Sequence, residues 1–340
     1  MVEAKKQETD MGHLQDGTWA QDEQLVEHDS NGAYIKQPSQ FRNWITADGK
    51  PGPTGGGGYR AESGRYVLYA ATSCPWAHRA VLYRVLKKLE DHIVLINTDQ
   101  KVDGEGWGFT EGGRRVAGTS HKANWLHEIY TLSDPGCTTR VTVPTIWDTQ
   151  TQTVVSNESS EIIRMFDAAF VNVAAPTPLL CPSDQRDEIN AMNTFILENI
   201  NNGVNRCGRS TSQSAYDEAF GALFEALDTL EERLGRQRYL VGDSQTEADW
   251  RLYPNLIRFD PIYFIGYRCN LRRVIDYPNL SNYLRELYQT PGIANVSDID
   301  GMKAGVFCKA GPIGWDGIIP RGPENLLMQP HDRSRFPVAA

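Results

Sequence analysis

Between residues 65 and 170 the sequence alternates short apolar runs with helical periodicity, and this order constrains the fold more than any other feature. Mostly apolar runs that are typical of buried strands lie at 66–70, 92–97, 141–147 and 153–156. Apolar residues at helical spacing lie at 75–89, 121–132 and 158–170. The resulting order, β-α-β-α-β-β-α, predicts an α/β domain with one mixed sheet.

This order is that of the thioredoxin fold, so we expect a thioredoxin-like domain over 61–172. After Pro176 and Pro178 the pattern becomes helical, and 183–295 predicts an all-α domain. A capping box, Thr246 to Asp249, precedes one of its apolar runs. Residues 1–60 are polar and rich in Gly and Pro, which predicts an extended arm. Residues 296–340 are predicted to form a mostly irregular tail.

Composition excludes several classes of function. The chain has 340 residues, 40% of them hydrophobic, and a formal net charge of −9. An acidic protein is poorly suited to holding nucleic acid or an anionic membrane by bulk charge, and no apolar stretch is long enough to span a bilayer. The six cysteines are scattered without a CxxC pair, which argues against a metal site and a disulfide framework. We therefore expect a cytoplasmic protein with no metal, nucleic-acid or membrane partner.

Cys74 is the residue to which chemistry is assigned first. It follows a predicted strand and opens a predicted helix, with Pro75 in the first helical turn. A cysteine at a helix N-terminus faces unpaired backbone N–H groups and the positive end of the helix dipole, and both favour the thiolate. A buried core thiol is the ordinary alternative, but it has no need of this junction. No second cysteine follows three residues later, so an external thiol must resolve a mixed disulfide; glutathione is the obvious candidate.

Two further segments fit a tripeptide ligand. Pro144 stands at the head of a strand, where such a fold commonly has a cis proline, and Val143 could then pair with an extended peptide. Glu158 and Ser159 precede a helix, where they could bind the ammonium and carboxylate of a γ-glutamyl group. An edge-strand proline and a plain N-cap are the corresponding structural interpretations.

Taken together, these residues resemble the glutathione transferases of the Xi class, the glutathionyl-hydroquinone reductases. The resemblance covers most of the chain. The segments that carry it are SQFRNW at 39–44, CPWAHR at 74–79, RVTVP at 140–144, NES at 157–159, NNGV at 201–204, ADWRL at 248–252, RFDP at 258–261 and DYPNL at 276–280.

The resemblance implies a glutathione transferase fold, a homodimer and glutathione as co-substrate. It implies that Cys74 is the nucleophile, that Trp107 lies against glutathione, and that Tyr263 is a tyrosine near the thiolate. The remaining glutathione-site residues that it implies are Arg140, Val141, Thr142, Val143, Pro144, Glu158 and Ser159. A buried loop anchor is the structural alternative for Trp107.

The acceptor half departs from the family pattern. Asn205 stands where the family has a tyrosine after NNGV, and Val306 replaces a second tyrosine in the C-terminal segment. The two histidines of that segment are Gly301 and Gly305 here. An asparagine can donate hydrogen bonds but cannot act as an acid near neutral pH, and a valine can do neither.

Three functions therefore remain open at the level of sequence. The first is a thiol transferase or lyase that cleaves a glutathionyl thioether or mixed disulfide of an aromatic or quinone-like molecule through a Cys74 mixed disulfide. The second is a conjugating or sulfur-inserting enzyme of a biosynthetic pathway, with Asn205 polarising an acceptor oxygen. The third is a non-catalytic binding protein. The retained nucleophile segment favours the first.

Overall fold

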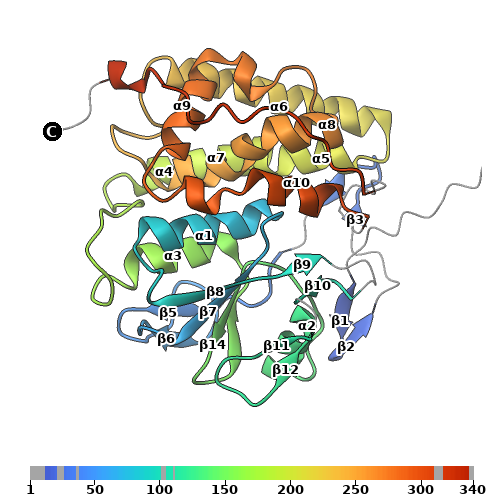
Figure 1. Cartoon of the computed structure of the whole chain (residues 1–340), viewed down its shortest axis with the longest axis vertical. Helices are drawn as coiled ribbons and strands as arrows, with labels where there is room; N and C mark the ends of the chain where they lie inside the picture. The colour runs from blue at the N-terminus through green and yellow to red at the C-terminus, as the bar shows by residue number, and fades with distance from the viewer. Residues whose placement is uncertain are drawn as a thin grey trace, which may run out of the picture.

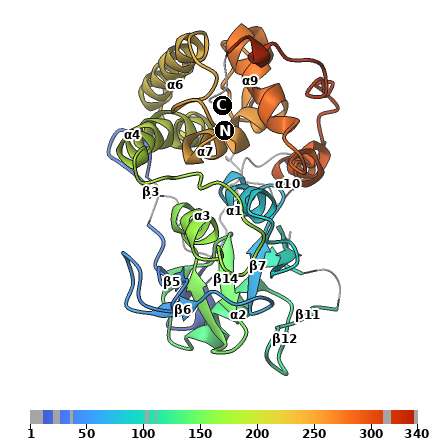
Figure 2. The same cartoon turned by 90° about the vertical axis from the view of Figure 1, so that its left-hand side faces the viewer.

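The computed structural model describes residues 12–20, 27–35, 38–100, 105–109, 112–309 and 317–336. Its helices lie in two groups, of which one covers a central sheet and the other forms a separate layer (Figures 1 and 2). The start of the predicted arm and the tail glycines between 310 and 316 lie outside the described residues.

The first half confirms the predicted α/β order. Its central sheet has the strand order β15-β14-β7-β8, with β7 (Tyr66–Ala70) parallel to β8 (Ile93–Asn97). Strand β14 (Thr145–Asp148) runs antiparallel to β7 and to β15 (Thr153–Ser156). All five residues of β7 are buried, as expected of a central strand with both faces covered.

Three helices pack on this sheet. Helices α1 (Pro75–Leu86) and α3 (Ser159–Ala168) lie side by side between the sheet and the helical half, as both views show. Helix α2 (Leu126–Ser133) begins five residues later than predicted. The reason is local, because the Glu128 carboxylate accepts hydrogen bonds from the backbone N–H groups of Asn124 and Trp125 and so caps the helix there.

The described part of the N-terminal arm forms short strand pairs on the domain surface. Strand β1 (His13–Gln15) pairs with β2 (Thr18–Ala20) and with β13 (Thr139–Arg140), and β5 (Trp44–Thr46) pairs in parallel with β6 (Gly58–Arg60). The remaining two-residue strands are β3 (Glu27–His28), β4 (Tyr34–Ile35), β9 (Asp99–Gln100), β10 (Trp107–Gly108), β11 (Arg114–Arg115) and β12 (Lys122–Ala123).

The second half is helical, as predicted. Its elements are α4 (Arg186–Ile196), the π-helical turn η1 (Leu197–Asn201), α5 (Asn202–Arg209), α6 (Gln213–Leu234), α7 (Glu247–Arg258), the π-helical turn η2 (Phe259–Tyr263), α8 (Phe264–Gly266), η3 (Val274–Asp276), α9 (Pro278–Tyr288) and η4 (Ala294–Val296). The predicted capping box opens α7, because the Asp249 carboxylate accepts hydrogen bonds from the N–H and the hydroxyl of Thr246. Among the described residues no helix is long and apolar enough to cross a bilayer.

The prediction of an irregular tail is wrong for 299–307, which form helix α10 (Ile299–Phe307). The Asp298 side chain caps this helix by accepting from the N–H of Gly301. Its glycines hid the helix at the level of sequence, because glycine is a poor helix former. Here they permit close packing on the residues that precede Cys74. Only the short turn η5 (Arg333–Arg335) follows among the described residues of the tail.

Candidate active site

Cys74 lies where the sequence predicts it, at the N-cap of α1 after β7. Its sulfur accepts a hydrogen bond from the backbone N–H of Ala77 at 3.4 Å, and its thiol lies 3.5 Å from the carbonyl oxygen of Val143. The Val143–Pro144 peptide is cis, as the sequence predicts. The fold therefore brings two segments that are far apart in sequence together around a half-buried thiol. A thiol in this position is available to a ligand and contacts the helix N-terminus that favours its thiolate.

Trp107 stands in β10 and is 8% exposed. Its indole N–H is buried and donates to no other group of the described residues. A buried donor without an acceptor is costly, so its position suits an acceptor atom supplied by a bound molecule. This feature fits a peptide ligand such as glutathione, which is rich in carbonyl and carboxylate oxygens.

Glu158 and Ser159 form the start of α3, and Glu158 is its N-cap. The Glu158 carboxylate accepts from the backbone N–H of Ser160 at 3.0 Å and from the hydroxyl of Ser39 at 2.9 Å. Ser39 belongs to the arm and was given no role by sequence reasoning, although it opens the first segment that carries the resemblance. The N-cap interpretation of Glu158 is thus correct, and the carboxylate remains half-buried beside the buried Ser159.

The segment 140–142 lies between these groups. Arg140 pairs in β13 with His13 of the arm, and Val141 is buried. Thr142 is held by hydrogen bonds, since its carbonyl accepts from the Tyr130 hydroxyl at 3.0 Å and its own hydroxyl accepts from the Asn157 amide at 3.1 Å. The backbone that leads to Val143 is therefore anchored on both sides.

On the acceptor side, Tyr263 closes the π-helical turn η2. It is 3% exposed, its hydroxyl has no partner among the described residues, and its ring stacks edge-on against Tyr267 with 5.1 Å between the ring centres. Burial raises the pKa of Tyr263 far above its usual value, while the nearby Arg258 lowers it and the Cys74 thiol raises it. The hydroxyl is therefore neutral at physiological pH and free to donate.

Asn205 and Val306 stand on two different helices. Asn205 is half-buried in α5, and its side-chain N–H donates to the carbonyl of Asn201 one turn earlier at 3.0 Å. Val306 is buried in α10. A catalytic role for Asn205 stays a prediction, and one of its two amide hydrogens is already used within its own helix.

Sequence reasoning missed Arg258, the last residue of α7. It is 1% exposed, and its guanidinium donates to the carbonyl of Thr72 at 2.8 Å and contacts Nδ1 of His78 at 3.0 Å. The available signal was an arginine within a largely apolar helical run that ends in RFDP. An arginine that is buried there needs polar partners from elsewhere in the chain.

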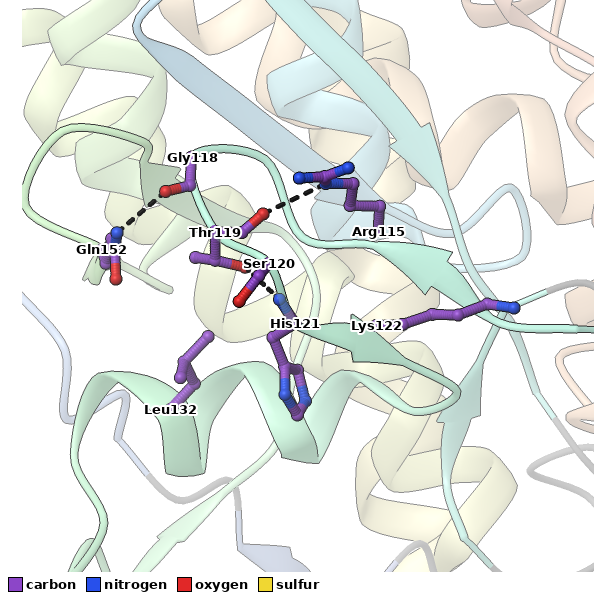
Figure 3. A pocket seen from close by; sticks show the side chains of 8 residues that line it. All are labelled: Arg115, Gly118, Thr119, Ser120, His121, Lys122, Leu132 and Gln152. Atoms are coloured by element: carbon purple, nitrogen blue, oxygen red, sulfur yellow. Dashed lines mark hydrogen bonds between the residues drawn. The ribbon is translucent and has the colours of Figure 1, made fainter.

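A different hollow, of about 860 Å³, lies on the β11–β12 hairpin and contains none of the predicted site residues. Figure 3 shows it lined by polar side chains that bind one another's backbone, for example Gln152 to the carbonyl of Gly118 and Arg115 to the carbonyl of Thr119. Of the predicted site residues, Val143 contacts the Cys74 thiol at the start of α1 and Tyr263 interacts with it electrostatically.

Comparison with known proteins shows the family of this chain. The chain matches the family models of the glutathione S-transferase N-terminal domain over 73–169 and C-terminal domain over 213–286. It is 43% identical to the glutathionyl-hydroquinone reductase YqjG of Escherichia coli strain K12, over 95% of this chain and 98% of the relative. The glutathione-bound structure of YqjG superposes with a TM-score of 0.85, covering 96% of this chain and 100% of the other.

Two further relatives agree. The glutathionyl-hydroquinone reductase PcpF of Sphingobium chlorophenolicum is 41% identical over 93% of this chain and 98% of its own length. A Xi-class glutathione transferase from Natrialba magadii has a TM-score of 0.84 at 37% identity, covering 97% of this chain and 98% of that chain.

Proposed function

This chain belongs to the Xi-class glutathione transferases, the family of the glutathionyl-hydroquinone reductases, and we propose that it reduces a glutathionyl thioether of a hydroquinone-like aromatic molecule through Cys74. It is a glutathione-dependent enzyme with glutathione as its co-substrate. The observation that carries the proposal is the half-buried Cys74 thiol at the N-terminus of α1, beside the carbonyl of Val143.

The proposed reaction has two steps. The Cys74 thiolate attacks the sulfur of the glutathionyl thioether, so an S–S bond forms and the C–S bond breaks. The electron pair of the broken bond stays on the aromatic carbon, which takes a proton and is thereby reduced. A second glutathione thiolate then attacks the mixed disulfide, releasing glutathione disulfide and restoring the Cys74 thiolate. In sum, the thioether and one glutathione become the hydroquinone and glutathione disulfide.

Tyr263 is our candidate for the proton donor to carbon. Its hydroxyl is buried and unpartnered among the described residues, and it interacts electrostatically with the Cys74 thiol. A general acid must carry its proton, and the Tyr263 hydroxyl does so at physiological pH because burial raises its pKa. Because the tyrosines of the family pattern are absent at Asn205 and Val306, we infer that the acid step depends on Tyr263 here.

The glutathione site we propose is built from Trp107, the segment 140–144, and Glu158 with Ser159. The indole N–H of Trp107, which is buried without a partner among the described residues, supports this proposal. The Glu158 carboxylate and the N-terminus of α3 suit the ammonium and carboxylate of the γ-glutamyl group.

We further propose that the enzyme works as a homodimer in the cytoplasm. Family membership supports the dimer, and six scattered cysteines without a CxxC pair support a reducing compartment. The net charge of −9 supports a small-molecule substrate rather than nucleic acid.

The test is to incubate the protein with glutathionyl-menadione and glutathione, and separately with free menadione and glutathione, and to follow products by mass spectrometry. Release of menadiol and glutathione disulfide, lost in Cys74→Ser and kept in Cys308→Ser, supports the proposal. A Cys74-dependent conjugate formed only from the free quinone would replace it with the conjugating alternative. No Cys74-dependent product from either mixture would contradict both.

A further inference from the structure

Arg258 is a buried cation that pairs with no carboxylate among the described residues. All of its hydrogen-bond partners among the described residues are uncharged: the carbonyl of Thr72 at 2.8 Å, the carbonyl of Pro254 at 3.0 Å, and Nδ1 of His78 at 3.0 Å. The Arg258 Nε–H has no partner at all within the same residues. Burying a charge costs free energy unless an opposite charge faces it, so the counter-ion must be found elsewhere.

Other buried arginines of the described chain do face carboxylates. Arg251 pairs with Glu247 at 3.3 Å, and Arg333 lies 3.9 Å from Glu286. Arg79 is also near Cys74, but Glu158 and Glu247 act on it as well. Among the described residues, Arg258 therefore differs from these three arginines in the kind of acidic group that can serve as its counter-ion.

The ionisable groups that face Arg258 are one thiol, three phenols and one imidazole. They are Cys74, Tyr253, Tyr263, Tyr267 and His78. Burial raises the pKa of each of the three tyrosines, and it lowers that of His78 far below its usual value, so these four groups stay neutral near pH 7. The remaining group of this set is Cys74, whose sulfur accepts from the Ala77 N–H at the helix N-terminus, a position that favours the thiolate.

The contacts of Arg258 also lie on either side of Cys74 in the chain. Thr72 stands two residues before the nucleophile. His78 lies in the first turn of α1, and its backbone N–H donates to the Cys74 carbonyl at 3.1 Å. The Arg258 guanidinium of α7 thus contacts both the loop before Cys74, at Thr72, and the helical turn after it, at His78. Arg258 and Thr72 are 186 residues apart in the sequence.

We propose that Arg258 is a positioning residue that holds Cys74 at the start of α1 and acts as the internal counter-ion of its thiolate. The proposal rests on the role of Cys74 proposed above. In this proposal the helical domain helps to stabilise the Cys74 thiolate through Arg258. The N-terminus of α1 would otherwise be the only group that stabilises it.

The same cation suits the charge movement of the reaction. When the S–S bond forms, the negative charge leaves the Cys74 sulfur. When the aromatic carbon takes the Tyr263 proton, the charge appears on the Tyr263 oxygen, which Arg258 also faces. A fixed positive charge that interacts with both groups stabilises the anion before and after the step without rearrangement.

The experiment measures the reactivity of the Cys74 thiol directly and does not require catalytic turnover. The wild type, Arg258→Gln and Arg258→Lys are alkylated with iodoacetamide from pH 4.5 to 9.5, and modification of the peptide that contains Cys74 is followed by mass spectrometry. Arg333→Gln is the matched control, because it removes an equally buried arginine that is held by carbonyl groups remote from Cys74. Circular dichroism melting establishes that each variant is folded.

We expect Arg258→Gln to move the midpoint of alkylation upward by about one pH unit, which makes the rate at pH 6 about tenfold slower. Arg258→Lys keeps the charge but cannot bridge Thr72 and His78, so we expect a rate at pH 6 about threefold slower. Arg333→Gln should match the wild type. If Arg258→Gln does not fold, the lysine variant decides.

Alkylation profiles that coincide for the wild type and a folded Arg258 variant would overturn the proposal. Failure of the proposed function looks different, since the menadiol assay would then show no product while the alkylation profiles still separate. The two proposals can therefore fail independently.

Discussion

Gly305 of helix α10 packs directly on Ser73, the residue before Cys74. A β-carbon at position 305 would lie 2.5 Å from the Ser73 β-carbon, and one at Gly301 would lie 3.1 Å from the methyl group of Thr72. The C-terminal helix therefore forms one wall of the site at a spacing that only glycine permits. At the two positions where the family pattern has histidines, this chain has Gly301 and Gly305, which let α10 pack closely on the segment before Cys74.

The first prediction concerns this packing. Gly305→Ala should lower the free energy of unfolding by about 1–3 kcal/mol, because the added methyl group overlaps Ser73 and overpacking costs that much. The control is Gly221→Ala in α6, where a β-carbon meets nothing within 4 Å. It should instead stabilise by about 0.5–1 kcal/mol, because alanine favours the helix. Urea denaturation of both variants measures the difference, and equal effects would show that α10 does not rest on Ser73.

Cys74→Ser should abolish product formation and leave the melting temperature within a few degrees of the wild type. The serine hydroxyl can still accept the Ala77 N–H, but it is not a thiolate. Cys308→Ser is the matched control, since that cysteine is also half-buried and also caps a helix end. Residual thiol transfer in the Cys74 variant would refute the nucleophile assignment.

Tyr263→Phe should lower kcat by about 10²-fold, the usual contribution of a general acid. Its stability should not fall, because the hydroxyl that is removed has no partner among the described residues. Tyr253→Phe provides the contrast, since the Tyr253 hydroxyl is within hydrogen-bond distance of the Ser297 hydroxyl at 2.8 Å and its loss should cost about 1 kcal/mol of stability. A Tyr263→Phe enzyme with unchanged kcat would remove Tyr263 from the mechanism.

Trp107→Phe should raise the KM for glutathione by about fivefold, because a buried N–H that binds a ligand oxygen contributes about 1 kcal/mol. Loss of the indole N–H should change the free energy of unfolding little, because this group has no partner among the described residues. Trp147→Phe reverses the pattern, since the Trp147 indole donates to the carbonyl of Ala117 at 2.9 Å within the core. That variant should unfold more easily and keep its KM. Steady-state kinetics and thermal melting distinguish the two, and an unchanged KM in Trp107→Phe would place glutathione elsewhere.

His78 should make the protein acid-sensitive. Burial and the Arg258 charge hold its folded-state pKa well below the unfolded value of about 6.5. Below about pH 6.5 His78 is therefore protonated in the unfolded chain but remains neutral in the folded chain. The free energy of unfolding consequently falls as the pH drops below about 6.5, by at most about 1.4 kcal/mol per pH unit. His78→Asn, which keeps an acceptor for Arg258, should reduce that slope. Urea unfolding at pH 7.5 and 5.5 checks it, and parallel losses would contradict this origin.

Much of the fold follows from local sequence. The runs at 66–70 and 153–156 became strands with those bounds, and the capping box at Thr246 opened α7 as predicted. The position of Cys74 at the head of α1 was equally readable, because a strand followed by Cys-Pro and a helical pattern is a local signal. Such features depend on residues a few positions apart, whose propensities and capping groups are visible in one dimension.

Features decided by distant contacts were not readable. The predicted strand at 141–147 became β14 at 145–148, because Pro144 cannot donate to a sheet, and residues 139–140, which precede the predicted strand, pair with β1 of the arm. Residues 299–307, predicted to be irregular, form α10, which packs against Ser73. The partners of residues 139–140 and of α10 lie more than a hundred residues away in the sequence.

The sequence by itself determined the class of the protein, the order of its elements and the position of Cys74 at a strand–helix junction. Only the tertiary structure decided what surrounds Cys74. Arg258 meets Thr72 across 186 residues, and Gly305 meets Ser73 across a still longer stretch of chain. Helix and strand preferences act between near neighbours, whereas burial of a charge and close packing of two backbones are properties of the assembled core.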